Sequence, residues 1–266
     1  MKTLILGDVV GRPGRDILKV VLGGVIEREG FDFVIVNGEN AAAGSGITKR
    51  LTEELLDCGI DVITTGDHVW KKRDVLEYLD EQACLLRPAN YPDDTHGQGH
   101  VVVSSRTGLS VGVINLIGRV FMNPVDCPFR KADRLVKQLQ KETNIIFVDF
   151  HTEATSEKIA MGWYLDGQVS CMFGTHTHVP TADERILPKG TAYITDVGMT
   201  GPYDSVIGRD KEKVIKTFLS RQPERFDVAV HDVRASGISV EVDEKTGKAT
   251  EIKRVVYQLE GKEEHV

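Results

Sequence analysis

Several features are scarce in this 266-residue sequence, and each shortage excludes a class of protein. Its four cysteines, Cys58, Cys84, Cys127 and Cys171, are widely spaced and form no CxxC pair. This spacing predicts reduced thiols rather than a disulfide framework or a zinc knuckle. No apolar run approaches the ~20 residues that cross a bilayer, and the run before Gly7 is too short for a signal peptide. We therefore expect a cytoplasmic protein that does not associate with a membrane.

Positive charge is also in short supply, since 33 Lys and Arg face 40 Asp and Glu and the net charge is −7. A protein that grips a nucleic-acid backbone needs clustered Lys and Arg to neutralise the phosphates. The charge balance therefore argues against binding of bulk nucleic acid. It remains compatible with a small phosphorylated substrate, because metal ions can supply positive charge locally.

What the sequence does contain is an alternation of short apolar runs and amphipathic stretches. Hydrophobic residues make up 41% of the chain and no linker divides it, so we expect one domain over residues 1–266. Short β-branched runs predict strands buried on both faces, at residues 3–6, 33–36, 62–64, 144–148 and 169–173. Helices are predicted at residues 16–28, 48–58 and 132–142, with a further one near 211–220. The alternation predicts an α/β fold with a largely parallel sheet.

Later segments depart from this parallel pattern. A tight-turn signal joins residues 99–105 to 109–116, and a second one joins 227–242 to 249–259, so both pairs are predicted hairpins. A mixed sheet or two stacked sheets would accommodate them better than one open parallel sheet. The segments 117–130 and 198–210 are rich in Gly, Pro and Asn and are candidates to cover a site.

Residues that can bind metals follow five of the predicted strands: Asp8, Glu39, Asn40, Asp67, His68, His151, His176 and His178. The carboxyl ends of parallel strands open onto one edge of a sheet, so we expect these side chains to lie together. Each of these residues, taken alone, also has a common structural role. An Asp after a strand commonly caps a helix, and a lone His commonly forms a structural hydrogen bond. Their conjunction at five strand ends predicts a metal centre.

The types of these residues narrow the kind of metal. Imidazole, carboxylate and carboxamide groups without a thiolate favour iron or manganese, with catalytic zinc as a further option, over structural zinc. Seven candidate ligands exceed the needs of one ion: Asp8, Glu39, Asn40, Asp67, His151, His176 and His178. Two divalent metal ions that share a carboxylate satisfy this number, and such pairs are typical of phosphate-ester hydrolases.

The same segments carry a resemblance to a known family. They are Gly7-Asp8, Asn-Gly-Glu-Asn at 37–40, Gly-Asp-His at 66–68, Asp-Phe-His at 149–151 and Gly-Thr-His-Thr-His at 174–178. In order and spacing they resemble the calcineurin-like metallophosphoesterases, most of all the bacterial YmdB branch, whose members act as 2′,3′-cyclic-nucleotide phosphodiesterases. The similarity extends over most of the chain and includes residues 11–15 and 195–208. It implies a four-layer α/β/β/α metallophosphoesterase sandwich with the metal pair at the sheet edge.

The resemblance also implies how the ligands divide between the two ions. One ion would take Asp8, Glu39, Asn40 and His178, and the other would take Glu39, Asp67, His151 and His176, with Glu39 bridging. The branch usually has Asn where this chain has Asp67, and Val10 stands where many metallophosphoesterases have His. The extra negative charge of Asp67 predicts tighter metal binding and weaker attraction for an anionic substrate.

A mechanism follows from this layout. A hydroxide bridging the two ions would attack phosphorus, and His68 would protonate the leaving ribose oxygen. His68 has an alternative role, in which it only orients the turn at Asp67. Five basic residues are candidates to assist phosphate binding, although a solvated surface charge is the commoner role for each: Arg12, Arg15, Lys49, Arg50 and Arg119. The substrate-binding residues therefore stay unassigned.

Three functions remain open at this point. The first is hydrolysis of a small phosphodiester, with a 2′,3′-cyclic nucleotide as the small-molecule substrate. The second is a regulatory scaffold of the same fold with weak or no catalysis, and the third is a phosphomonoesterase. A homo-oligomer is compatible with all three.

Overall fold

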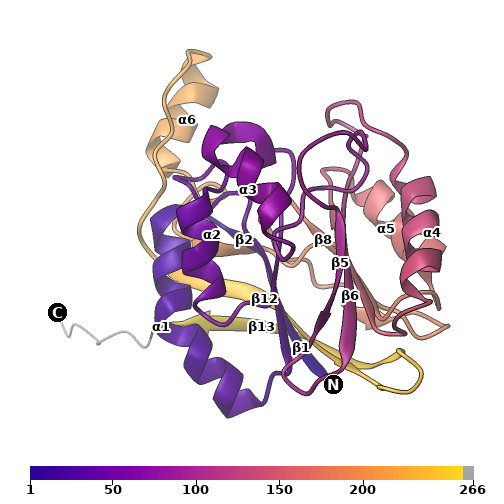
Figure 1. Cartoon of the computed structure of the whole chain (residues 1–266). Coiled ribbons are helices and arrows are strands. Elements are labelled where there is room, and N and C mark those ends of the chain that lie inside the picture. The colour runs from indigo at the N-terminus through magenta and orange to yellow at the C-terminus, as the bar shows by residue number, and fades with distance from the viewer. Residues whose placement is uncertain (260–266) are drawn as a thin grey trace.

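The computed structural model describes residues 1–259, and it contains two β-sheets packed face to face (Figure 1). The first sheet has the strand order β2-β11-β12-β1-β3-β4, with β13 paired to β12. Its strands are β1 (Lys2–Leu6), β2 (Asp8–Val9), β3 (Phe33–Asn37), β4 (Val62–Thr64), β11 (Met199–Pro202), β12 (Val233–Val242) and β13 (Ala249–Gln258). Strands β1, β3 and β4 are parallel, whereas β12 is antiparallel to β1, β11 and β13. Residues 260–266 of the predicted domain lie outside the described residues.

The second sheet has the order β5-β6-β7-β8-β10-β9. Its strands are β5 (His100–Ser104), β6 (Ser110–Ile117), β7 (Ile146–His151), β8 (Cys171–Thr175), β9 (Arg185–Ile186) and β10 (Ala192–Ile194). The four central strands are parallel, and the two edge strands β5 and β9 are antiparallel to their neighbours. Both predicted hairpins are confirmed, as β5–β6 and β12–β13, and two stacked sheets accommodate them.

Helices cover the outer face of each sheet (Figure 1). Helices α1 (Gly11–Glu29) and α2 (Lys49–Leu56) lie on the first sheet, and α4 (Pro128–Leu139) and α5 (Thr155–Leu165) lie on the second. Thr48 is the N-cap of α2, because its Oγ1 accepts a hydrogen bond from Leu51 N at 3.3 Å. The molecule is therefore an α/β/β/α sandwich, as the resemblance implied. Among the residues that the structure describes, no helix combines the length and apolar character that a membrane span requires.

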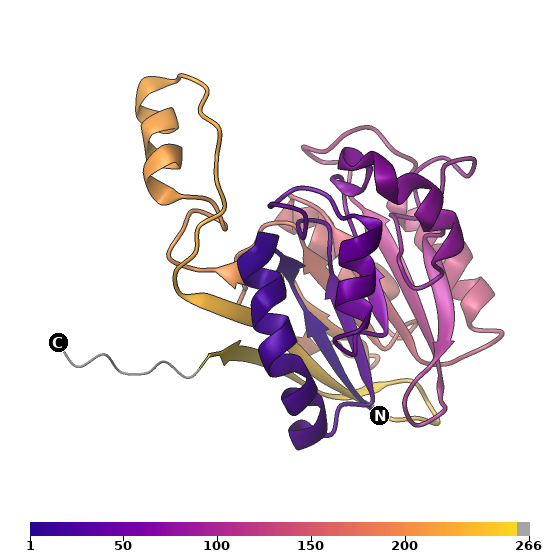
Figure 2. The same ribbon diagram turned by 60° about the vertical axis from the view of Figure 1, so that its left-hand side comes forward.

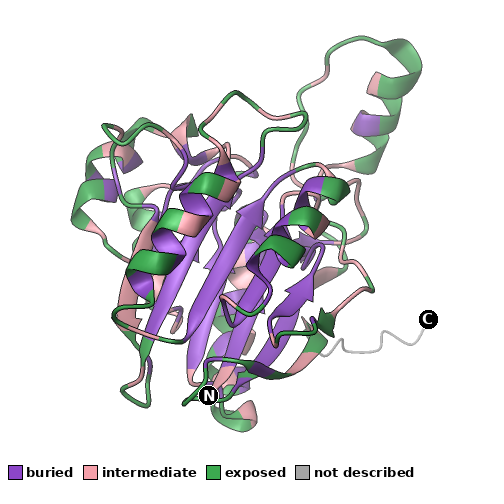
Figure 3. Cartoon of the chain, turned by 90° about the vertical axis from the view of Figure 1, so that its right-hand side faces the viewer, coloured by how far each residue is buried: buried purple, intermediate pink, exposed green. Residues whose placement is uncertain are grey.

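The apolar core fills the three spaces between the two helical layers and the two sheets. The middle layer lies between the sheets and contains Ile5 and Phe33 from the first sheet and Phe147 and Phe173 from the second. Successive strand residues point to opposite faces, so the neighbours of these side chains enter the two outer layers, beneath the helices. The strands are consequently buried on both faces while the helices expose their outer sides (Figure 3).

Two helices were not predicted from the sequence. Helix α3 (Leu76–Glu81) has only six residues, too few to show a helical period. Helix α5 has a longer span, but its buried face includes Glu157 and Lys158, so charged residues interrupt the apolar stripe. The predicted helix near 211–220 is α6 (Lys211–Ser220), which projects away from the sandwich (Figure 2).

Candidate metal centre

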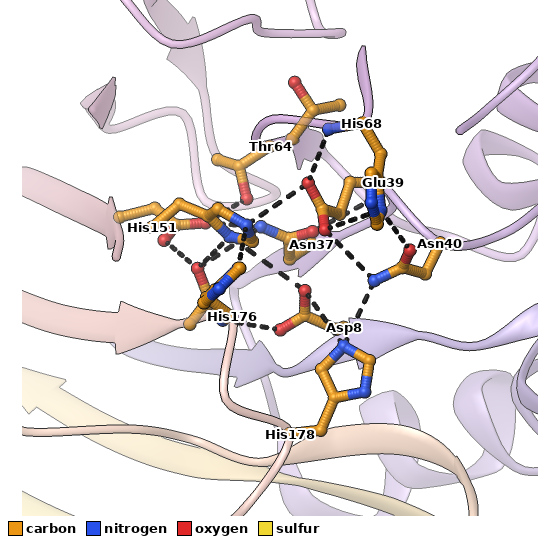
Figure 4. Close-up of polar contacts among 12 residues, drawn as sticks. Asp8, Asn37, Glu39, Asn40, Thr64, His68, His151, His176 and His178 are labelled. Carbon is orange, nitrogen blue, oxygen red and sulfur yellow. Dashed lines mark hydrogen bonds and ion pairs between the residues drawn. The ribbon is translucent and has the colours of Figure 1, made fainter. Parts of the chain in front are cut away.

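The predicted metal ligands lie at one end of the sandwich, where strands of both sheets terminate (Figure 4). From the first sheet come Asp8 after β1, Glu39 and Asn40 after β3, and Asp67 and His68 after β4. The second sheet supplies His151 at the end of β7, and His176 and His178 after β8. The expectation of a single sheet edge was therefore wrong in one respect. Two sheets supply the residues, which meet across the layer between them.

Four side chains form the closest group. Glu39, Asp67, His151 and His176 each offer one nitrogen or oxygen atom, and these atoms lie within 4.8 Å of one another. His151 Nε2 is 3.2 Å from Glu39 Oε2 and 3.3 Å from Asp67 Oδ1. His176 Nδ1 is 3.0 Å from His151 Nε2 and 3.6 Å from Asp67 Oδ1. Two imidazoles facing two carboxylates match the donors that iron, manganese and zinc accept.

A second group, Asp8, Asn40 and His178, lies directly beside the first. His178 Nε2 is 3.1 Å from Asn40 Nδ2 and 3.8 Å from Asp8 Oδ1. Asn40 Nδ2 also donates a hydrogen bond to Glu39 Oε1 at 3.1 Å. The two oxygens of Glu39 thus face different groups, which places this carboxylate between them.

His68 lies next to both groups and is 30% exposed. Its Nδ1 is 2.8 Å from Asn40 Oδ1 and 3.4 Å from Glu39 Oε1. Its Nε2 is 3.7 Å from Asp67 Oδ2, and its backbone N–H donates to Glu39 Oε2 at 3.3 Å. His68 is therefore close enough to exchange a proton with a molecule bound over the cluster.

Each of the three clustered histidines has one ring nitrogen engaged outside the cluster. Nδ1 of His151 contacts Thr175 Oγ1 at 2.9 Å, and Nε2 of His176 contacts Glu153 Oε2 at 3.1 Å. Nδ1 of His178 donates to the carbonyl oxygen of Ile207 at 2.9 Å. In a neutral ring the N–H can occupy this outer nitrogen, so that the other nitrogen can offer its lone pair to a cation, as metal-binding histidines require.

Burial and charge shift the pKa values of the clustered groups. Burial raises the pKa of Asp8 to about 6. Burial also acts to raise the pKa of Glu39, but the charge and hydrogen bonds of His151 and His68 outweigh it and hold that pKa well below its usual value. Burial and the charge of His151 lower the pKa of His176 to about 4, whereas the hydrogen bond to Glu39 raises the pKa of His68. Strongly shifted pKa values among adjacent groups are typical of functional sites.

The cluster fits divalent cations. Two buried carboxylate oxygens, Asp8 Oδ1 and Asp67 Oδ1, have no hydrogen-bond partner among the described residues. Such oxygens are costly to bury, and contact with a cation would offset that cost. The backbone also keeps the space clear, because a Cβ at Gly66 would lie 2.2 Å from Glu39 Oε2 and from His151 Nε2.

A polar layer lies beneath the cluster, between the two sheets, and sequence reasoning assigned it no role. Asp149 is fully buried and accepts hydrogen bonds from Thr64, Thr175 and Asn37. The predicted strand stopped before Asp149, but β7 continues to His151, which puts both side chains on the same face. Thr175 Oγ1 donates to Asp149 Oδ1 at 2.7 Å and contacts His151, so this layer orients the His151 ring.

The loop that carries His176 and His178 has an uncommon backbone conformation. Their φ angles are +96° and +65°, in the left-handed region that side-chain-bearing residues rarely adopt. Such conformations cost free energy and persist only where surrounding contacts hold them, commonly at functional sites. In this conformation Nδ1 of His176 faces His151 and Nε2 of His178 faces Asp8 (Figure 4).

A buried ion pair forms hydrogen bonds with this loop. Lys158 of α5 is fully buried and donates to Asp196 Oδ2 at 2.7 Å and to the carbonyl oxygen of Thr175 at 2.8 Å. Asp196 Oδ2 also accepts hydrogen bonds from Thr177, from its N–H at 3.2 Å and its hydroxyl at 2.8 Å. Lys158 and Asp196 thus bond to Thr175 and Thr177, the two residues next to His176. The sequence assigned no role to either residue, although Asp196 lies within the segment 195–208 that carries part of the family resemblance.

A cavity of about 360 Å³ opens over the cluster. It is lined by five of the candidate site residues, Glu39, Asn40, His68, His176 and His178, and by Gly44, Glu153, Thr177, Ile207 and Arg209, to which the sequence assigned no individual role. Of the two segments expected to cover a site, 198–210 supplies Ile207 and Arg209, whereas the described lining contains no residue of 117–130. The volume lies at the lower end of the range for small-molecule sites.

The basic residues singled out in the sequence do not line this cavity. Four of them pair with carboxylates instead, in the pairs Arg12–Asp16 at 3.1 Å, Arg15–Glu54 at 3.0 Å, Lys49–Glu81 at 3.7 Å and Arg50–Glu54 at 3.3 Å. Arg119 is exposed and is also absent from the described lining. The reading of these residues as surface charges fits their surroundings better than a role in phosphate binding.

Fold and site together define the class of this protein. An α/β/β/α sandwich with histidine, carboxylate and carboxamide side chains converging from both sheets is a metallophosphoesterase. The chain belongs to the family of YmdB-like proteins, whose sequence pattern matches residues 4–255. The resemblance noted in the sequence is thereby confirmed.

Individual relatives cover nearly the whole chain. Over 256 residues, 96% of this chain and 97% of the relative, it is 50% identical to the 2′,3′-cyclic-nucleotide 2′-phosphodiesterase of Bacillus subtilis (strain 168). The crystal structure of a hypothetical protein from Thermus thermophilus matches with a TM-score of 0.90 and 40% identity, covering 97% of this chain and 99% of that one. A novel phosphatase from Mycoplasma pneumoniae also matches with a TM-score of 0.90, at 38% identity over 97% of this chain and 93% of that one.

Proposed function

We propose that this protein is a cytoplasmic, metal-dependent phosphodiesterase that hydrolyses small phosphodiesters, with 2′,3′-cyclic nucleotides as its main substrates. The observation that carries this proposal is the convergence of seven side chains of metal-binding type from five strand ends beneath a cavity of about 360 Å³. The similarity to the Bacillus subtilis enzyme supports the choice of substrate. A cavity of this size suits a mononucleotide better than a long nucleic acid.

Two divalent cations, iron or manganese ahead of zinc, would occupy the centre. We assign Asp8, Glu39, Asn40 and His178 to one cation, and Glu39, Asp67, His151 and His176 to the other. Glu39 suits a bridging role because Oε1 lies 3.1 Å from Asn40 Nδ2 while Oε2 lies 3.2 Å from His151 Nε2. The oxygen-rich donor set favours iron and manganese over zinc.

The protein side chains have separate tasks in this reaction. When bound, the cation pair supplies positive charge that promotes the ionisation of water and neutralises the phosphoryl group. His68 donates a proton to the leaving ribose oxygen, because its ring lies beside both ligand groups and an imidazole exchanges protons near neutral pH. Thr175 and Glu153 hold the rings of His151 and His176 in the orientation that binding requires.

The alternative functions make different demands on the site. A regulatory scaffold would be free to lose ligands, yet all seven positions hold chemically competent side chains. A phosphomonoesterase would use the same centre, so only substrate preference separates it from a phosphodiesterase. We therefore place phosphodiester hydrolysis first.

One assay separates these functions. Manganese- or iron-loaded protein would be tested with 2′,3′-cyclic AMP, 3′,5′-cyclic AMP and a nitrophenyl phosphate monoester, with chelator-treated protein as the control. We expect metal-dependent hydrolysis with the highest kcat/KM for 2′,3′-cyclic AMP. A higher value for the monoester would favour the phosphomonoesterase, and no turnover by fully loaded protein would favour the scaffold.

Glu39→Gln is expected to lower the bound manganese from two ions per chain to one or fewer. The substitution removes the charge of a fully buried carboxylate that lies between both ligand groups. Metal analysis after gel filtration would measure the loss. Addition of manganese should also raise the melting temperature of the wild type but not of the variant, since ligands that bind only the folded state stabilise it. Glu77→Gln, a surface site on α3, is the matched control, and equal metal content in all three proteins would contradict the assignment.

Asp67→Asn is expected to weaken manganese binding about tenfold, which corresponds to ~1.4 kcal/mol. Asp67 is one of three carboxylates at the centre, and its Oδ1 faces both His151 and His176. Loss of its charge should also lower KM for an anionic substrate, because less negative charge then surrounds the cavity. Titration with manganese and steady-state kinetics would measure both effects. Unchanged metal affinity together with unchanged KM would show that the charge of Asp67 has no influence.

A further inference from the structure

Arg209 is a half-buried cation on the wall of the cavity. It lies between β11 and α6 and lines the cavity together with His68 and His178. Its guanidinium donates to two carbonyl oxygens, that of Ala43 at 3.3 Å and that of Gly44. Burial lowers the pKa of Arg209, and no carboxylate of the described residues opposes this shift. An arginine nonetheless stays protonated, so the wall carries a positive charge without a counterion among those residues.

This situation differs from that of the basic residues that were singled out in the sequence. Arg12, Arg15, Lys49 and Arg50 each lie within 4.0 Å of a carboxylate oxygen, as described above. A partly desolvated charge without an oppositely charged partner is unfavourable, and an anion that entered the cavity would offset the free-energy cost. Planar guanidinium groups bind phosphate oxygens through paired hydrogen bonds, and two of the five N–H groups of Arg209 are engaged by carbonyls.

The loop after β3 fixes the place of the guanidinium. The same loop carries Glu39, Asn40 and Gly44, so it connects the proposed ligands to the arginine. Gly44 has a φ of +80°, and a Cβ at this position would lie 2.5 Å from Nη1 of Arg209. Any larger residue would therefore push the guanidinium away from its present site, with no change in charge.

We propose that Arg209 binds the phosphoryl anion of the substrate and thereby sets the KM of the reaction. The inference rests on the proposed phosphodiesterase function. Because the same anion is present in the ground state and in the transition state, the contact stabilises both. Its loss should therefore raise KM and leave kcat nearly unchanged.

The first test replaces the charge and keeps a donor. Arg209→Gln retains an N–H that can bond a loop carbonyl, whereas Arg209→Lys retains the charge. In manganese-loaded protein we expect Arg209→Gln to raise KM for 2′,3′-cyclic AMP about 10–100-fold, typical of a lost charged hydrogen bond, with kcat within about threefold. The Kd of inorganic phosphate, measured by calorimetry, should rise by a similar factor. Arg209→Lys should lie between the wild type and Arg209→Gln, and Arg12→Gln, an exposed site, should match the wild type.

The second test moves the guanidinium without altering its charge. Gly44→Ala should weaken phosphate binding in the wild type but add little in the Arg209→Gln background, because the contact is already lost. Gly30→Ala is the control for backbone strain, since Gly30 has a φ of +68° and no neighbouring atom within 4 Å of its Cβ position. It should leave phosphate binding unchanged.

Two results would overturn the proposal. One is an unchanged KM and an unchanged phosphate Kd in Arg209→Gln. The other is an equal fall in kcat in Arg209→Gln and Arg209→Lys with KM unaltered, which would make Arg209 only an anchor for the loop. If wild-type protein binds phosphate through Arg209 but hydrolyses no phosphodiester, the binding role stands and the proposed function fails.

Discussion

Replacing His68 with alanine is expected to lower kcat for 2′,3′-cyclic AMP about 10²–10⁴-fold, the usual contribution of a positioned proton donor. Both cations should remain bound, because His68 is not one of the seven proposed ligands. Glu39 and Asn40 keep their contacts to His151 and His178 when the His68 ring is removed. Steady-state kinetics combined with metal analysis would measure the two quantities in the same preparation.

The choice of substrate separates proton donation from a purely orienting role. A nitrophenyl phosphodiester has a leaving group that departs without protonation, so His68→Ala should hydrolyse it at close to the wild-type rate. If His68 only orients the turn at Asp67, both substrates should lose the same factor. His96→Ala is the matched control, since His96 is half exposed and bonds Asp80 outside the cavity. Wild-type turnover of the cyclic nucleotide by His68→Ala would remove this residue from the mechanism.

Replacing Lys158 with methionine is expected to lower the free energy of unfolding by about 3–5 kcal/mol, the usual cost of leaving one charge of a buried pair without its partner. Methionine has a similar length but cannot neutralise Asp196 or donate to the carbonyl oxygen of Thr175. Because these contacts bracket His176, manganese affinity should fall as well. Urea denaturation and manganese titration would measure the two losses.

A second substitution tests whether the unpaired charge is the cause. Lys158→Met combined with Asp196→Asn should be more stable than Lys158→Met alone, because no buried charge is then left unpaired and Asn still accepts a hydrogen bond. Lys137→Met on α4 is the surface control, since Lys137 is exposed and bonds only Asp133 among the described residues, and its stability should stay within ~0.5 kcal/mol of the wild type. A double variant as unstable as the single one would show that packing, not charge, explains the loss.

The local sequence predicted a strand or a helix wherever a segment had a clear hydrophobic pattern. Short β-branched runs predicted the central strands, and alternation with amphipathic stretches predicted the helices α1, α2 and α4. Helix α5 was missed because it buries Glu157 and Lys158, whose partners include the distant Arg119 and Asp196. Buried charges disturb the apolar stripe from which a helix is recognised.

The local sequence patterns narrowed the two-sheet arrangement without deciding it, and only the family resemblance implied two stacked sheets. Two hairpins following a parallel pattern were compatible with one mixed sheet or with two stacked sheets. Which sheet a strand joins depends on hydrogen bonds between distant segments, such as β1 with β12. The clustering of the candidate ligands was nevertheless predictable, because the carboxyl ends of parallel strands lie together in either arrangement.

By itself, then, the sequence determined the fold class, the family and the residue types available to a metal centre, since these depend on periodicity, order and spacing along the chain. Only the tertiary structure decided which groups support that centre. Asn37 and Asp149 are 112 positions apart, and Gly44 and Arg209 are 165 apart, yet each pair is joined by a hydrogen bond. Contacts of this kind leave no mark in local sequence, because they arise only when the sheets pack and loops from different strands meet.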